Sequence, residues 1–243
     1  MSKPLIISFA SLGRDNYLEA SENVYLSVKD HWKYDYLFYT MDGNRNEFAG
    51  MKLTQITELP QPSTWTCNPH SVTPYQFKFG LIDHAREMGY DKIIWLDSSI
   101  TLNKCPLKLL EQSNKGVMCF HNLGFETKDF ISPECENLLG MNDYDDLNLN
   151  APQIWGGCIG FDFTKETAID IFHRVVNCSL KGCFDNSPTF KKHRHDQATM
   201  SILFHYFGVL PYNYGHIVTN EHHENKEYGN YYTFVYGRNY RQA

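Results

Sequence analysis

Short apolar runs alternate with amphipathic segments along the first hundred residues of the chain. The runs have the length and composition of buried strands, which are expected at residues 5–10 (LIISFA), 34–40 (YDYLFYT), 52–56 and 93–97 (IIWLD). Between them, apolar side chains recur at helical spacing over residues 15–31 and 76–88, and the Pro- and Ser-rich residues 59–75 are expected to be a loop. This alternation predicts parallel β/α construction.

The second half of the chain carries the same kinds of pattern. It predicts strands at residues 116–120 and 154–163, an irregular polar excursion over the candidate site at 121–152, and a helix near 168–176. In residues 195–208, HDQATMSILFHYFG, apolar side chains stand at positions i, i+3, i+4 and i+7, which predicts a helix. Asp196 in its first turn and Gly208 at its end occupy positions that helix capping favours.

The composition is that of a globular protein, with 42% hydrophobic and 21% charged residues. At 243 residues the chain can bury a sizeable core, so a single domain over residues 1–243 is expected. The formal net charge of −6 argues against nucleic acid as a partner, since a protein that coats a duplex needs a basic face. A small anionic ligand stays compatible with a local basic cluster.

The seven cysteines are scattered along the chain, with no C-x-x-C pair. This pattern is typical of a reducing compartment and not of a disulfide framework or a zinc site. No run approaches the roughly 18 apolar residues of a transmembrane segment. The apolar run near the N-terminus is short and is interpreted as the first strand instead of a signal peptide. A cytoplasmic protein is therefore expected.

Three segments, in this order, resemble the nucleotide-sugar glycosyltransferases of the GT-A fold. They are YDKIIWLDSSITL with its strand-terminal Asp97, PQIWGGCIGFDF with its glycine pair, and KKHRHDQATMSIL with its His-Asp-Gln helix start. The resemblance covers about residues 5–220. It implies an α/β, Rossmann-like, mostly parallel central sheet flanked by helices. It also implies transfer of a hexosyl or pentosyl group from a UDP- or GDP-linked donor to a hydroxyl of a glycan, lipid-linked or protein-linked acceptor.

The sequence departs from the family at its metal-binding motif. The family has Asp-x-Asp after the strand equivalent to IIWLD, whereas this chain has Asp97-Ser98-Ser99. One alternative is a weak Mn²⁺ or Mg²⁺ site in which Asp97 is joined by a late histidine, with His223 favoured over His216 and His222. The other is a metal-independent enzyme, in which Asp97 binds the ribose and basic side chains neutralise the diphosphate. The candidates for that role are Arg14, Lys78, Lys191, Lys192, Arg194 and Arg238.

The resemblance also implies which residues touch the substrates. Asp196 is expected to contact the transferred sugar or to take the acceptor proton, and Gln197 to bind sugar hydroxyls. Donor contacts are expected from Ala10, Ser11, Arg14, Lys78, Asp97, Ser98, Ser99, Gly156, Gly157 and His195. The two glycines would let the backbone approach the ligand. All of this requires Asp97 and Asp196, 99 positions apart, to converge in space.

Simpler interpretations stay open. Asp97 could form only a turn hydrogen bond, Asp196 could be only a helix cap, and the glycine pair could serve packing alone. Ser99 favours a catalytically inactive nucleotide-sugar or carbohydrate-binding module. A nucleotidyltransferase would need a second acid and a glycine-rich basic first loop. His193 and His195 beside Asp196 could suggest a metallohydrolase, but the further acid-histidine pair of such sites is missing, and the two histidines are expected to face solvent.

Overall fold

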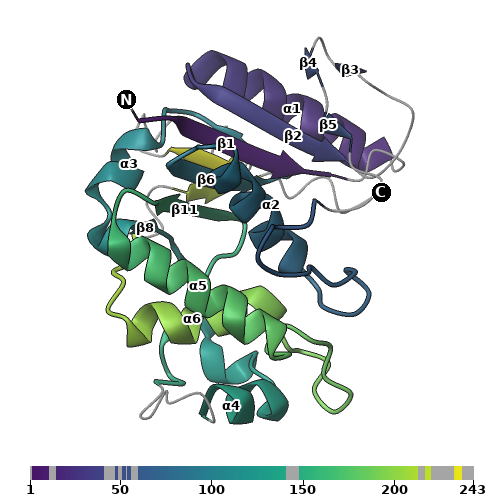
Figure 1. Cartoon of the computed structure of the whole chain (residues 1–243), viewed down its shortest axis with the longest axis vertical. Helices are drawn as coiled ribbons and strands as arrows, with labels where there is room; N and C mark the ends of the chain where they lie inside the picture. The colour runs from purple at the N-terminus through teal and green to yellow at the C-terminus, as the bar shows by residue number, and fades with distance from the viewer. Residues whose placement is uncertain are drawn as a thin grey trace.

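The computed structural model describes residues 2–10, 15–40, 47–48, 51–52, 54–55, 60–140, 148–212, 217–219 and 233–236. Its centre is a six-stranded sheet within these ranges, flanked by helices on both faces (Figure 1). In spatial order the strands are β5 (Thr54–Gln55), β2 (Asp35–Thr40), β1 (Pro4–Phe9), β6 (Lys92–Asp97), β11 (Cys158–Asp162) and β8 (Val117–Met118). The first four are parallel, and β11 runs antiparallel to both of its neighbours.

Alternate residues of the central strands enter two separate cores. On β6, Ile93 and Trp95 face one side of the sheet, and Ile94 and Leu96 face the other. The helices α2 (Gln76–Glu87), α5 (Glu166–Leu180) and α6 (His195–Tyr206) pack in the first core, and α1 (Asp15–His31) and α3 (Leu107–Gln112) in the second. Because both faces are covered, the buried middle of β1 and β6 is a continuous apolar run.

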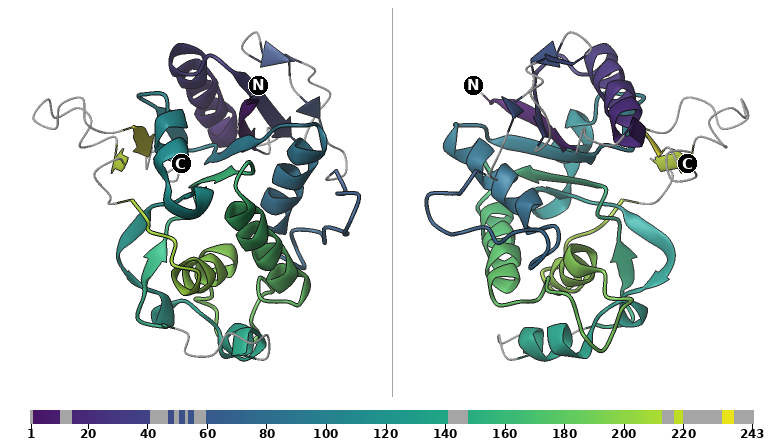
Figure 2. Two further views of the ribbon diagram at one scale, coloured as in Figure 1. Left: turned by 60° about the vertical axis from the view of Figure 1, so that its left-hand side comes forward. Right: turned by 90° about the vertical axis from the view of Figure 1, so that its right-hand side faces the viewer.

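A second layer lies below the central sheet in Figures 1 and 2. It contains an antiparallel pair, β9 (His121–Glu126) and β10 (Pro152–Ile154), and the helices α4 (Pro133–Gly140) and α6. Short 3₁₀ turns, η1 (Asn114–Gly116) and η2 (Thr127–Asp129), precede β8 and α4. The remaining strands are β3 (Glu47–Phe48), β4 (Met51–Lys52), β7 (Ile100–Leu102), β12 (Ile217–Thr219) and β13 (Phe234–Tyr236). Of these, β7, β12 and β13 form a small sheet, and β3 pairs with β4.

The predicted elements are confirmed at α1, α2, α5, α6, β1, β2 and β6. Gly208 follows α6 with φ of +66°, the left-handed conformation that ends a helix. Two predictions were wrong. Residues 154–163 are not one strand, because a turn at Gly156 and Gly157 separates β10 from β11. The described residues between 121 and 152 are not irregular, because β9, η2, α4 and the start of β10 lie among them. The strand expected at 116–120 covers only Val117–Met118, and the one expected at 52–56 is divided between β4 and β5.

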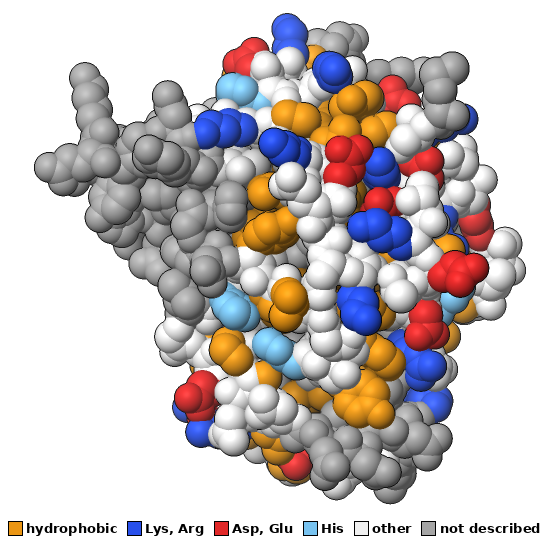
Figure 3. All heavy atoms as spheres, turned by 90° about the vertical axis from the view of Figure 1, so that its left-hand side faces the viewer, with side chains coloured by type: hydrophobic (Ala, Val, Ile, Leu, Met, Phe, Trp, Pro, Cys, Tyr) orange, Lys and Arg blue, Asp and Glu red, His pale blue; other side chains and the backbone are white. Residues whose placement is uncertain are grey.

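The surface carries no dominant charge on the face shown in Figure 3. Over the described part of that face, basic, acidic and hydrophobic side chains are interspersed. All seven cysteines lie in the described ranges, and all are free thiols. None of the described helices has the length and apolar character needed to cross a bilayer.

Candidate functional site

Asp97 is the last residue of β6, at the carboxyl end of the parallel strands. Its backbone N–H donates to Gly157 O at 2.8 Å, which fixes the strand end against the turn before β11. Its carboxylate oxygen Oδ1 accepts a hydrogen bond from Trp95 Nε1 at 2.7 Å. Trp95 is two residues earlier on the same strand, so both side chains lie on one face of the sheet. The Asp97 side chain is still 44% exposed and open to a ligand.

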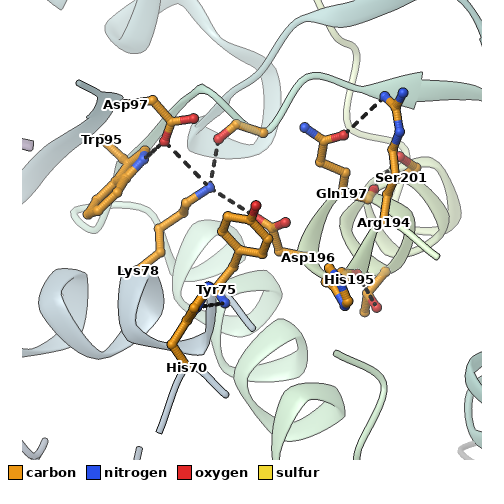
Figure 4. Close-up of polar contacts among 12 residues, drawn as sticks. His70, Tyr75, Lys78, Trp95, Asp97, Arg194, His195, Asp196, Gln197 and Ser201 are labelled. Carbon is orange, nitrogen blue, oxygen red and sulfur yellow. Dashed lines mark hydrogen bonds and ion pairs between the residues drawn. The ribbon is translucent and has the colours of Figure 1, made fainter. Parts of the chain in front are cut away.

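Lys78, on the first turns of α2, joins the two acids that the sequence analysis singled out (Figure 4). Its ammonium nitrogen lies 2.7 Å from Asp196 Oδ2 and 4.0 Å from Asp97 Oδ1. The same nitrogen donates to Gly156 O at 2.8 Å. The predicted convergence of Asp97 and Asp196 is therefore confirmed, and one buried lysine holds it.

The charge of Lys78 is maintained by its neighbours. Burial by itself lowers the pKa of this lysine, since the side chain is only 2% exposed. The carboxylates of Asp196 and Asp97 oppose that effect and raise the pKa above its ordinary value. Lys78 therefore stays an ammonium. Asp196, Gly156 and Asp97 thus surround the ammonium, and its expected contact with a donor stays a prediction.

Asp196 is buried, with a side chain 4% exposed, in the first turn of α6. The interpretation of this residue as only a helix cap is wrong, because the N-cap residue is Arg194 and the Asp196 carboxylate bonds Lys78. Of its two carboxylate oxygens, Oδ2 accepts the hydrogen bond from Lys78, and Oδ1 has no hydrogen bond within the described part of the chain.

The glycine pair is required by packing within the chain. A Cβ atom on Gly156 would lie 2.7 Å from Gln197 Cγ, and one on Gly157 would lie 2.8 Å from Ile100 Cδ1. The space beside both glycines is therefore filled by the protein's own side chains. This packing brings Gln197 onto the backbone that holds Lys78, and the expectation that the same backbone also approaches a ligand stays a prediction.

His193 and His195 were both expected to face solvent, and this prediction is wrong for His193. His193 is buried, accepts a hydrogen bond at Nδ1 from Ser132 N–H and donates from Nε2 to Cys183 O. His195 donates from Nδ1 to Phe184 O at 3.0 Å. Both nitrogens of His193 are thus occupied, and the described residues contain no group of three or more metal-binding side chains. The geometry gives the metallohydrolase interpretation no support.

Two residues beside the acids have unusual backbone conformations. Tyr75, the N-cap of α2, has φ of 63°, and His195, the first residue of α6, has φ of 31°. Their rings lie 5.8 Å apart, and the Tyr75 ring is 5.6 Å from the Lys78 ammonium. Non-glycine residues with positive φ are strained and are frequent at functional sites. No apolar periodicity or motif in the sequence could have identified Tyr75.

The remaining predicted site residues are placed as follows. Ala10 is buried, and its N–H is already bonded to Tyr39 O at 3.1 Å. Ser98 is buried and Ser99 is partly exposed in the turn after β6. Gln197 is partly exposed and lies between Arg194 and the Lys78 cluster in Figure 4. Lys191 and Lys192 are exposed in the turn before α6. The candidates outside the described residues are Ser11, Arg14, His216, His222, His223 and Arg238.

Comparison with known proteins gives structural neighbours only. No family model matches the chain, and no curated protein matches it. The solved structures that resemble it include apo WbbM, a bifunctional glycosyltransferase, with a TM-score of 0.54 and 15% identity over 97% of this chain. The match spans 45% of the WbbM chain. A second neighbour is a glycosyltransferase involved in glycosylation of the major capsid of PBCV-1. It has a TM-score of 0.53 and 14% identity, over 96% of this chain and 93% of its own. The chain therefore has the GT-A-like α/β fold of glycosyltransferases.

Proposed function

We propose that the chain is a glycosyltransferase. It would move one hexosyl or pentosyl group from a UDP- or GDP-linked donor to a hydroxyl of a glycan, lipid-linked or protein-linked acceptor. The observation that carries this proposal is the convergence of Asp97 and Asp196 on Lys78 at the carboxyl end of β6. Open α/β sheets hold their ligands at that edge. The two structural neighbours, both described as glycosyltransferases, support the same class of reaction.

The roles follow from the contacts. Asp196 is the acid nearest the reacting carbon, and it contacts the transferred sugar or takes the acceptor proton through Oδ1. Lys78 holds the other oxygen, Oδ2, and so fixes the direction in which Oδ1 points. Gln197 bonds sugar hydroxyls beside it. A carboxylate held in one orientation loses less freedom in the transition state, which is how positioning contributes to rate.

The leaving diphosphate needs positive charge from another source. Lys78 contributes +1 and the two aspartates −2, so this cluster has a formal charge of −1. Mg²⁺ is commonly bound by one or two carboxylates together with substrate phosphates, and Asp97, with its exposed carboxylate, fits that requirement. When bound, such an ion would neutralise charge on the diphosphate. The metal-independent alternative assigns this role to basic side chains, including Arg14 and Arg238.

The test is turnover of the donor. Purified protein is incubated with a panel of UDP- and GDP-sugars, with and without glycan acceptors, and released nucleotide is measured. We expect slow hydrolysis of at least one donor and faster release with an acceptor. Asp196→Asn should abolish both; because it also removes the partner of the buried Lys78, it should lower the melting temperature, so turnover is measured at a temperature at which circular dichroism shows the variant to be folded. Undiminished turnover in that variant would remove Asp196 from the mechanism.

A second candidate function is a nucleotide-sugar or carbohydrate-binding module without catalysis. It is favoured by Ser99, which stands where the family has its second metal-binding acid. A pure binding module would bind the nucleotide or the glycan in calorimetry and release no nucleotide from any donor. The same incubation therefore separates the two functions.

A further inference from the structure

The guanidinium of Arg194 packs against two aromatic rings that also contact each other. The central carbon of its guanidinium lies 4.5 Å from the ring centroid of Phe125 and 4.2 Å from that of Phe130. Its Nη1 donates to Gln153 Oε1 at 2.9 Å and approaches Gln197 Oε1 at 3.5 Å. Its backbone N–H donates to Phe130 O. The guanidinium is thus held in a single orientation before any ligand arrives.

This guanidinium has no acidic partner in the described part of the chain. Burial lowers the pKa of Arg194. Two other arginines that stack on aromatic rings do have an acidic partner. Arg86, on Phe163 and Phe172, pairs with Asp83 at 3.0 Å, and Arg174, on Phe207, pairs with Asp170 at 3.1 Å. A partly buried charge without a counterion is costly, so the lack of an acidic partner for Arg194 among the described residues requires an explanation.

A second unsatisfied donor lies next to it. Gln153 is fully buried, and its side-chain oxygen accepts hydrogen bonds from Arg194 and from Asn122. The nitrogen of the same amide, Nε2, has no hydrogen-bond partner within the described residues. Buried donors of this kind are normally paired. An anion at Arg194 would supply acceptor oxygens for the remaining guanidinium N–H groups, and for the amide once a neighbouring side chain moves aside to uncover it.

Contacts connect Arg194 with the reacting acids. Gln197 reaches from Arg194 to the backbone of Gly156, which accepts the hydrogen bond from Lys78. In Figure 4, Arg194 lies on the far side of Gln197 from Asp97. A ligand at Arg194 therefore sits beside the sugar that Asp196 would contact, and at the opposite end of the site from Asp97.

We propose that Arg194, together with Gln153, binds an anionic substituent of a sugar substrate, a carboxylate or a phosphate. This inference rests on the proposed function, since it places the anion on a sugar. The guanidinium is suited to the role because its planar N–H groups match two oxygens of such a group. The anionic sugar belongs to the donor or to the acceptor, and the experiment below separates these two sources.

The experiment compares matched anionic and neutral probes. Binding of methyl β-glucuronide and methyl β-glucoside tests the acceptor, and binding of UDP-glucuronate and UDP-glucose tests the donor, all by saturation-transfer NMR or calorimetry. In one of the two pairs we expect the wild-type protein to prefer the anionic member about tenfold or more. Arg194→Gln should remove that preference, and Arg194→Lys should retain part of it.

The matched control is Arg174→Gln, which removes a stacked arginine that has its own carboxylate. It should keep the wild-type preference. Because Arg194 has no carboxylate partner among the described residues, Arg194→Gln should also keep its melting temperature within about 3 °C of wild type. No preference in either pair, a preference that survives Arg194→Gln, or loss of plain UDP binding in that variant would each overturn the inference. The last result would assign Arg194 to the diphosphate.

The outcome is separable from that of the proposed function. A preference that depends on Arg194, in a protein that hydrolyses no donor, would support an anion-selective carbohydrate-binding module and refute the transferase. Donor turnover without any such preference would support the transferase and refute the role of Arg194.

Discussion

At the scale of single residues, the site depends on where one buried positive charge is placed. Lys78 lies between the faces of Trp95 and Tyr75, with its ammonium 5.5 and 5.6 Å from the two ring centroids. The rings shield the charge from water, and the carboxylates of Asp97 and Asp196 compensate it. Each acid keeps a separate role, because Asp97 remains exposed whereas Asp196 is buried.

Removing the positive charge should destabilise the protein strongly. Lys78→Met keeps the length of the side chain but leaves the Asp196 carboxylate and Gly156 O without their partner. We expect a loss of about 3 kcal/mol or more in the free energy of unfolding, measured by urea denaturation, because an isolated buried charge is costly. Lys92→Met is the control, since Lys92 pairs with the half-exposed Glu111 at 2.8 Å. Its loss should stay below about 1 kcal/mol. Equal losses would show that the Lys78 ion pair does not matter for stability.

At the scale of elements, the start of α6 brings the chemistry together. The helix begins where His193 connects two other segments through Ser132 N–H and Cys183 O. Arg194, His195, Asp196 and Gln197 follow in one turn, so a shift of this helix would move all four. The glycine pair between β10 and β11 provides the opposing surface, on which Gln197 rests.

Protonation of His193 at acid pH should destabilise the start of α6. Burial is the main reason that the pKa of His193 is lowered, and His195 adds to the effect, while Glu134 and two carbonyls oppose it. Because the folded-state pKa lies below the unfolded value of about 6.5, the unfolded chain binds more protons between the two. The stability contribution is therefore complete above pH 6.5 and is lost as the pH falls through that window.

His193→Gln should reduce the pH dependence. Urea denaturation at pH 7 and pH 5 would measure it for wild type and variant. The wild-type protein should lose more stability between these pH values than the variant, which has no titrating ring at this position. Identical losses would assign the acid sensitivity to other histidines such as His70 and His121, whose pKa values are also lowered by burial.

At the scale of the whole molecule, the fold brings α2, β6, the turn before β11 and α6 to the carboxyl edge of one sheet. Lys78 and Asp196 are 118 positions apart and meet only because of this arrangement. A ligand held at this edge contacts all four segments, so its binding should stabilise the molecule as a unit.

Nucleotide binding should therefore be visible in thermal unfolding. At a UDP or GDP concentration of about 100 times Kd, linkage gives roughly 2.7 kcal/mol, a rise of several degrees in melting temperature. If Asp97 holds Mn²⁺ or Mg²⁺ together with the diphosphate, EDTA should reduce this rise, and Asp97→Ala should remove the part that is sensitive to EDTA. A rise that EDTA leaves unchanged would favour the metal-independent alternative.

The sequence by itself determined the elements and the two acids. Local apolar periodicity is sufficient to predict α1, α2, α6, β1 and β6, because burial of one face or both faces leaves a regular pattern. The position of Asp97 at the end of an apolar run, and of Asp196 at a helix start, could be recognised for the same reason. The turn inside residues 154–163 could not be recognised from the sequence, because the pattern there is continuously apolar.

Only the tertiary structure decided how these parts act together. It assigned Lys78 to both acids, filled the space beside the glycines with Gln197 and Ile100, and gave Arg194 two aromatic rings but, within the ranges that the structure describes, no carboxylate. The physical reason is that ion pairing, steric exclusion and desolvation depend on distances between residues far apart in the chain. A linear pattern of residue types specifies which groups exist, and the fold specifies which of them come within reach of each other.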